Sequence, residues 1–155
     1  MKKQLTVLVF LLIPCFGWSQ VVTTVSNVTI CTGPTTVQVP VKVSSFNAVG
    51  SISLKFSYVN SELTSPSVVY KDAGLDAWGT FQTNFTTPGT IIISAYDPDV
   101  TPPVTGLTLA DNTTLFTLQF TIGTITNPSP VSFVENTQGA SCEYGGVGPD
   151  YTPFL

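Results

Sequence analysis

The side chains that could carry out chemistry in this 155-residue chain are mainly carboxylates, because it contains three cysteines and no histidine. Without histidine, Ser–His and Cys–His nucleophile systems and histidine metal sites are excluded. A glycosidase would need two carboxylates held on opposite sides of the scissile bond. Nearly all the candidates stand beside Gly, Pro or Asn, where turn formation explains them and we expect no catalysis: Asp72, Asp76, Asp97, Asp99, Asp111 and Glu135.

The Asp97-Pro-Asp99 turn is the best candidate for a metal site. Calcium takes six to eight oxygen ligands, and these two carboxylates, with loop carbonyls and Asp111, could supply some of them. The spacing does not match an EF-hand loop. A solvated acidic turn that ends the preceding strand is the alternative and the simpler interpretation, so we expect no obligatory cofactor.

An aromatic loop suggests binding instead of catalysis. Residues 70–81 (YKDAGLDAWGTF) place Trp78 beside Gly79 in a polar segment. A tryptophan in a loop can stack on a sugar ring or anchor a protein partner. It can also fold over the edge of the domain and close the core. A carbohydrate-binding surface would need at least two coplanar exposed aromatic side chains, drawn from Tyr70, Trp78, Phe81 and Tyr96.

The first nineteen residues have the order of a secretory signal peptide, with two lysines, an apolar run from Leu5 to Phe16, and the small residues Gly17 and Ser19 at the end. The apolar run is too short for a bilayer, which needs about 20 residues. We expect cleavage after Ser19, or after Gln20, and a secreted or cell-surface domain over residues 20–155 without membrane insertion. Lipid anchoring through Cys15 is the alternative. The domain is either barely complete at Leu155 or cut short there.

Charge and cysteine content narrow the class of partner. After the leader, three lysines stand against nine carboxylates, a net charge of −6. Phosphate binding needs clustered Lys and Arg, so we expect no nucleic-acid partner. Cys31 and Cys142 remain, and in an oxidising compartment such a pair predicts a disulfide, with two buried thiols as the alternative. A disulfide would place the first and last strands side by side.

The elements that must position these residues are strands, since Val, Thr, Ser, Pro and Gly dominate and helix signals are almost absent. In residues 51–58 (SISLKFSY) Ile52, Leu54 and Phe56 alternate with polar residues, as in a half-buried strand. Pro40 requires an edge position or a bulge. Many short strands predict an all-β sandwich. The predicted strands are residues 21–30, 37–43, 51–58, 67–70, 80–84, 91–96, 114–122 and 131–134.

The order of these motifs resembles a cohesin domain. Residues 37–64 (VQVPVKVSSFNAVGSISLKFSYVNSELT) resemble the opening of that family, with Tyr58-Val59-Asn60 where the family usually has Tyr-Asp-Pro. Residues 91–100 (IIISAYDPDV) and 109–122 (LADNTTLFTLQFTI) resemble its central strand, acidic loop and following strand. The two cysteines, with CEYGG at 142–146, look like cohesin-like domains of secreted proteins in Bacteroidetes-type bacteria.

The resemblance implies a jelly-roll sandwich of about nine strands, related to carbohydrate-binding modules. It implies a non-catalytic domain that binds a calcium-loaded dockerin through one sheet face in extracellular polysaccharide degradation. A protein binder predicts a flat sheet face of mixed polar and apolar side chains, with the outward serines of residues 51–58 and Lys55 on it. A carbohydrate-binding module predicts the aromatic platform instead. A structural or adhesive module of a cell-surface protein predicts neither feature.

Overall fold

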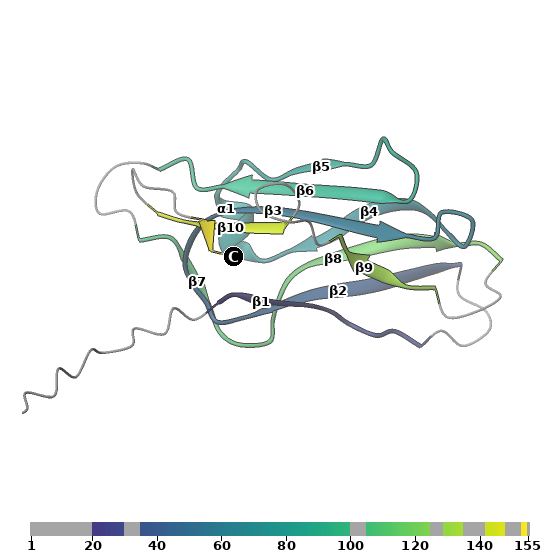
Figure 1. Cartoon of the computed structure of the whole chain (residues 1–155), viewed down its shortest axis with the longest axis horizontal. Helices are drawn as coiled ribbons and strands as arrows, with labels where there is room; N and C mark the ends of the chain where they lie inside the picture. Colours follow the sequence, from purple (N-terminus) through teal and green to yellow (C-terminus); the bar gives the residue numbers. More distant parts are fainter. Residues whose placement is uncertain are drawn as a thin grey trace, which may run out of the picture.

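The chain folds as two antiparallel β-sheets packed face to face, as predicted (Figure 1). The computed structural model describes residues 20–29, 35–99, 105–124, 129–134, 142–147 and 153–154, and all structural statements refer to these. The predicted signal peptide and Cys31 lie outside the described residues. In the part of the chain that is described, no helix is long and apolar enough to cross a membrane.

Each sheet has a simple strand order. Sheet A contains, from edge to edge, β1 (Val22–Val25), β2 (Thr36–Ser44), β8 (Thr113–Ile122) and β4 (Leu63–Lys71). Sheet B contains β11 (Pro153–Phe154), β10 (Cys142–Gly146), β3 (Phe46–Tyr58), β6 (Thr90–Tyr96) and β5 (Gln82–Asn84). The short strands β7 (Leu107–Leu109) and β9 (Val131–Phe133) also pair with β3. A short helix, α1 (Ala73–Ala77), follows β4.

The 13-residue strand β3 organises sheet B, because each of its sides is paired by two successive short strands. On one side β9 is followed by β10, and the Val134 N–H donates to the Lys55 carbonyl between them at 2.9 Å. On the other side β6 is followed by β7, and the Asp97 N–H donates to the Gly50 carbonyl at 2.8 Å. Sheet B therefore has five strand positions and sheet A four, which agrees with the predicted nine.

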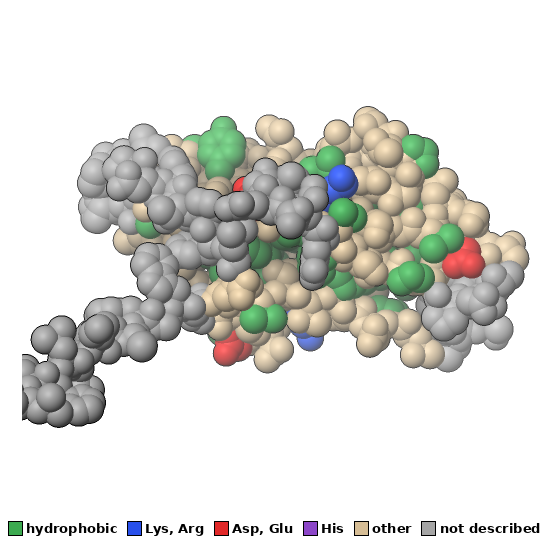
Figure 2. Space-filling view, in the orientation of Figure 1, with side chains coloured by type: hydrophobic (Ala, Val, Ile, Leu, Met, Phe, Trp, Pro, Cys, Tyr) green, Lys and Arg blue, Asp and Glu red, His purple; other side chains and the backbone are tan. Residues whose placement is uncertain are grey.

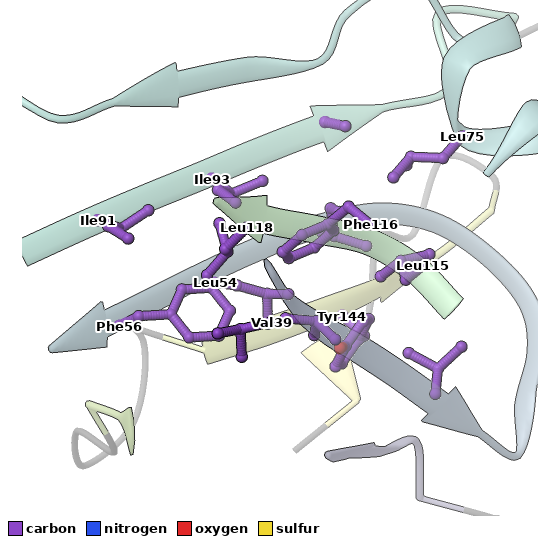
Figure 3. Close-up of a cluster of buried hydrophobic side chains, with 14 of the residues drawn as sticks. Val39, Leu54, Phe56, Leu75, Ile91, Ile93, Leu115, Phe116, Leu118 and Tyr144 are labelled. Atoms are coloured by element: carbon purple, nitrogen blue, oxygen red, sulfur yellow. The ribbon is translucent and has the colours of Figure 1, made fainter. Parts of the chain in front are cut away.

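The core lies between the two sheets and is built by the predicted alternation of apolar residues. Leu54 and Phe56 of β3 point inward beside Ile91 and Ile93 of β6, and they meet side chains of sheet A such as Phe116 (Figure 3). The Phe56 and Phe116 rings pack edge to face with their centroids 6.0 Å apart. Each fully buried side chain of this size contributes about 1.5–3 kcal/mol, so the core holds the two sheets together.

Pro40 lies in β2 one residue beyond the stretch that β1 pairs, a local edge of the sheet and one of the two settings that a proline requires. It lies opposite Thr117 in unbroken register with β8, and the bulge of this ladder falls further along, between Val41 and Lys42, where β8 has the extra residue. Pro40 has no N–H to donate, but its carbonyl accepts from the Ser26 N–H at 3.0 Å, one residue beyond the end of β1. The sheet therefore loses little pairing at this position.

The short helix α1 was not among the predicted elements. The Asp72 side chain accepts a hydrogen bond from the Gly74 N–H at 2.9 Å and caps the helix, as short acidic side chains often do. Leu75 is fully buried and packs into the core cluster. One turn of helix has no detectable period in a sequence, so tertiary packing of Leu75 decides this element.

Candidate partner-binding face

The outer surface of sheet B forms a continuous face built by alternation along its strands. Successive side chains of a strand point to opposite faces of the sheet. Since Ile52, Leu54 and Phe56 are buried, the residues between them face outward, and the same holds on the neighbouring strands. We call this surface the sheet B face; it consists of Ser51, Ser53, Lys55, Ser57, Gln82, Asn84, Thr90, Ile92, Ser94, Tyr96, Ser132 and Glu143.

The sheet B face mixes short hydroxyl side chains with two exposed apolar ones. Ser53 lies opposite Ser94 in the β3–β6 register, and Ser57 lies opposite Thr90. Ile92 is 38% exposed and Tyr96 is 52% exposed. Because their neighbours on β3 are serines and a lysine, Ile92 and Tyr96 have no large apolar side chain beside them on that strand. Such a surface can contact another protein over a broad area with two apolar anchor points.

The charges on the sheet B face are few. Lys55 lies directly opposite Ile92, and Glu143 lies opposite Ser53. Within the described ranges the one ion pair found is between Lys71 and Asp76, so neither Lys55 nor Glu143 is neutralised by a described partner. Figure 2 likewise shows a molecular surface on which charged side chains are sparse and hydrophobic ones are scattered. Among the residues of the sheet B face, Lys55 carries the positive charge and Glu143 the negative one.

The predicted aromatic residues do not form a shared platform for a sugar. Trp78 is only 7% exposed and belongs to the core cluster, so the alternative that it closes the core is correct. Phe81 packs against Phe116 at 6.1 Å between centroids, and the Lys71 ammonium covers its ring. Tyr70 and Tyr96 are 48% and 52% exposed, but they belong to different sheets, on β4 and β6.

The predicted calcium ligands are not brought together as a cation site. Asp97 accepts a hydrogen bond from the Asp99 N–H at 3.0 Å, which closes a local turn after β6. Asp111 accepts from the Ser45 N–H at 2.7 Å, which ties the β7–β8 turn to the bend between β2 and β3. Over the described segments, no group of three or more His, Cys, Asp or Glu side chains could hold a metal ion. The simpler interpretation, acidic turns, fits these residues.

The predicted disulfide stays a prediction, because Cys31 lies outside the described residues. Cys142 begins β10, and its sulfur lies 3.6 Å from the Lys55 carbonyl oxygen and 3.8 Å from that of Val134. The strands β1 and β10, which belong to different sheets, do contact each other through one pair of side chains. The hydroxyl of Thr23 on β1 hydrogen-bonds that of Tyr144 on β10, a contact that nothing in the sequence pattern indicated.

Tyr144 is the strongly perturbed titratable group near this contact. Its side chain is 6% exposed and packs edge to face on Phe46, with ring centroids 5.7 Å apart. Burial raises the pKa of the Tyr144 hydroxyl far above its ordinary value, and the hydrogen bond with Thr23 offsets this only in part. The neutral hydroxyl therefore acts as a structural link between the sheets.

Comparison with known proteins supports the fold assignment. No protein-family model matches the chain, and no curated protein matches it. The solution structure of the cohesin CaCohA2 from Clostridium acetobutylicum is similar, with a TM-score of 0.64 at 23% identity over 87% of this chain and 83% of that chain. A chain of the Coh-OlpA–Doc918 complex, a type I cohesin–dockerin complex from Clostridium thermocellum, is similar with a TM-score of 0.64 at 14% identity, covering 88% and 92%. A non-cellulosomal cohesin from the archaeon Archaeoglobus fulgidus is similar with a TM-score of 0.53 at 20% identity, covering 78% and 73%.

The domain is thus cohesin-like, as its motifs predicted, and at these identities the likeness concerns the fold. The narrower likeness to Bacteroidetes-type secreted proteins stays a prediction.

Proposed function

We propose that this chain is a non-catalytic, protein-binding module that takes a dockerin-type partner on its sheet B face. The observation that carries the proposal is the exposure of Ile92 and Tyr96 among short hydroxyl side chains, with Lys55 opposite Ile92. The structural similarity to cohesins, one of them in a complex with a dockerin, supports the same class of partner.

Binding on this face would work by surface complementarity on a rigid support. The backbone of β3 is paired along both sides, so its outward side chains keep their positions when a partner docks. Ile92 and Tyr96 would fill shallow pockets of the partner, and such central anchors usually carry most of the binding energy. The hydroxyl side chains would hydrogen-bond around them, and Lys55 would select a partner with a carboxylate opposite.

The predicted signal peptide adds a location outside the cytoplasm to the proposal. A secreted or cell-surface module that binds dockerins would recruit enzymes to extracellular polysaccharide degradation. Direct binding of a polysaccharide has less support, because Trp78 is buried and the two exposed tyrosines belong to different sheets. A purely structural or adhesive role would not account for the exposure of Ile92 and Tyr96 on one face.

The test is calorimetric titration of the chain with a panel of calcium-loaded dockerins, with Doc918 as the first probe. Ile92→Ala and Tyr96→Ala should each weaken binding by about tenfold or more, as expected for anchor residues. The matched controls are Val69→Ala and Tyr70→Ala on β4, which remove equally exposed side chains from sheet A and should change nothing. Binding that is unaffected by the sheet B variants, or binding of polysaccharides and of no dockerin, would refute the proposal.

A further inference from the structure

The outer surface of sheet A carries an uncharged polar region that the proposed function does not use. On β2 and β8 the residues between the buried ones face outward, and the registers of β2 and β4 with β8 place them in rows across the sheet. The charged Lys42 lies outside this region, opposite Thr114. We call the region the sheet A face; its rows are Pro40–Thr117–Tyr70, Gln38–Gln119–Ser67 and Thr36–Thr121–Thr64.

The side chains of the sheet A face reach solvent in the folded chain. Tyr70 is 48% exposed, and Gln38, Thr36 and Thr121 are exposed as well. Because none of the side chains in its rows carries a charge, the face suits a neutral ligand with many hydrogen-bonding groups.

A β-bulge in β4 directs Tyr70 to this face. Val68 lies opposite Leu118 and Tyr70 opposite Thr117, so Val69 between them has no counterpart on β8. Val68 packs against the core, whereas Val69 and Tyr70 are both exposed, by 45% and 48%. A bulge re-aims a side chain without ending the strand, and bulges are common beside functional sites.

The row that contains Tyr70 offers an apolar surface. Thr117 faces outward between Pro40 and Tyr70, and it is only 8% exposed because these two larger side chains flank it. The exposed part of this row is therefore made by two rings. A sugar ring has an apolar side of C–H groups, which can pack on the face of an aromatic ring.

The next row offers amide groups in a fixed mutual orientation. The Gln38 Nε2 donates to the Gln119 Oε1 at 3.1 Å. This bond leaves the carbonyl oxygen of Gln38 as an acceptor and the N–H groups of Gln119 as donors. A sugar hydroxyl both donates and accepts, so neighbouring hydroxyls can bond both amides. Since the two amides already orient each other, binding restricts these side chains less than it would restrict free ones.

We propose that the sheet A face binds a neutral oligosaccharide chain that lies along β8. Tyr70 would stack on one sugar ring, and the Gln38–Gln119 pair would hydrogen-bond the next one. Thr121 would hydrogen-bond the ring beyond it. From Thr117 to Thr121 the face extends about 13 Å along β8, which is longer than one sugar ring. The site combines one aromatic ring with amides, and so differs from the platform of two tyrosines that the structure excludes.

The composition of the sheet A face favours a sugar over a protein. The centre of a protein interface is enriched in apolar side chains, whereas the centre of this face is the pair Gln38 and Gln119. A glycan presents hydroxyls on nearly every ring, and these match amide and hydroxyl side chains. The inference does not rest on the proposed dockerin binding. The two faces belong to different sheets, so a dockerin on the sheet B face would leave the sheet A face open.

The test is an NMR titration of the exported, isotope-labelled chain with a panel of neutral hexasaccharides built of β-linked glucose, β-linked xylose, β-linked mannose or α-linked glucose. At up to millimolar concentration, at least one of them should shift the backbone amide signals of β8. The side-chain amide signals of Gln38 and Gln119 should shift with them. The signals of Ile92 and Tyr96 on the sheet B face should stay in place.

Substitutions test the role of each group in this binding. Tyr70→Ala should weaken it about tenfold, whereas Tyr70→Phe keeps the ring and should retain most of the affinity. Gln119→Ala should weaken it about fivefold, through the loss of one hydrogen bond. The matched control is Tyr96→Ala, which removes an equally exposed tyrosine from the other sheet and should change nothing. The spectrum of each free variant shows whether it is folded.

Each of the following results would overturn the inference. Spectra that no hexasaccharide of the panel changes would show that the face takes no neutral glycan. Shifts confined to the sheet B face, or an affinity that Tyr70→Ala and Gln119→Ala leave unchanged, would place the sugar elsewhere. Dockerin binding that is lost in a folded Tyr70→Ala variant, without any glycan binding, would assign the sheet A face to a protein partner.

Discussion

Replacing the buried Tyr144 by phenylalanine gives a sharp test of the link between the two sheets. Tyr144→Phe keeps the ring that packs on Phe46 and removes only the hydroxyl that hydrogen-bonds Thr23. At neutral pH the free energy of unfolding should fall by about 1 kcal/mol, the typical contribution of one such hydrogen bond. Thr23 is half-exposed and can bond water instead, so a larger loss is not expected.

The same variant should reverse its effect in alkali. Burial raises the pKa of Tyr144 in the folded protein, whereas in the unfolded chain the hydroxyl ionises near its ordinary value of about 10. Above that pH the unfolded state alone loses the proton, so the wild type loses about 1.4 kcal/mol of stability per pH unit through this group. Phenylalanine does not ionise. The two stability curves should therefore cross close to about pH 11.

The measurement is urea unfolding of both proteins at a series of pH values from neutral to strongly alkaline. The contributions of all other titrating groups cancel in the difference between the two proteins. A difference that stays constant across the whole range would show that Tyr144 ionises as easily in the folded state as in the unfolded one. In that case the assignment of Tyr144 as a buried neutral link would be refuted.

Two further substitutions separate the interpretations of the loop residues. Trp78→Ala should lower the free energy of unfolding by about 3–5 kcal/mol, because it removes a core side chain. The exposed Tyr96 is the control, and Tyr96→Ala should change this free energy little. Urea titrations followed by circular dichroism measure both variants, and equal small losses would contradict the burial of Trp78. Asp111→Ala should cost about 1 kcal/mol through the lost bond from the Ser45 N–H. If this carboxylate served a calcium site instead, a chelator would lower the wild-type melting temperature, which we expect to stay unchanged.

Much of the architecture could be predicted because it rests on local alternation. The inward positions of β3 and β8 follow from a period of two residues, and the structure buries Ile52, Leu54 and Phe56 as the pattern indicates. The local edge position of Pro40 was predictable for the same kind of reason, since the missing N–H is a property of the residue itself. The outward residues of each single strand follow likewise, because they lie between the buried ones.

The site residues were harder to predict, because exposure depends on segments distant in sequence. The residues around Trp78 have the composition of a binding loop. The helix α1, which Asp72 caps, nevertheless places Trp78 in the core. Asp111 looks like a loop ligand, and its carboxylate is engaged by Ser45, 66 residues away in sequence. The short strand β7 had too few residues to give a periodic signal and exists because β3 offers it an edge.

The sequence by itself determined the absence of histidine chemistry, the excess of negative charge and the two-residue period that makes strands. These are properties of residue types and of their immediate neighbours. The tertiary structure alone decided which exposed residues share a surface, and that Thr23 meets Tyr144 across the sandwich. The physical reason is that strand order and register are set by packing between segments far apart in the chain, and no local pattern contains that information.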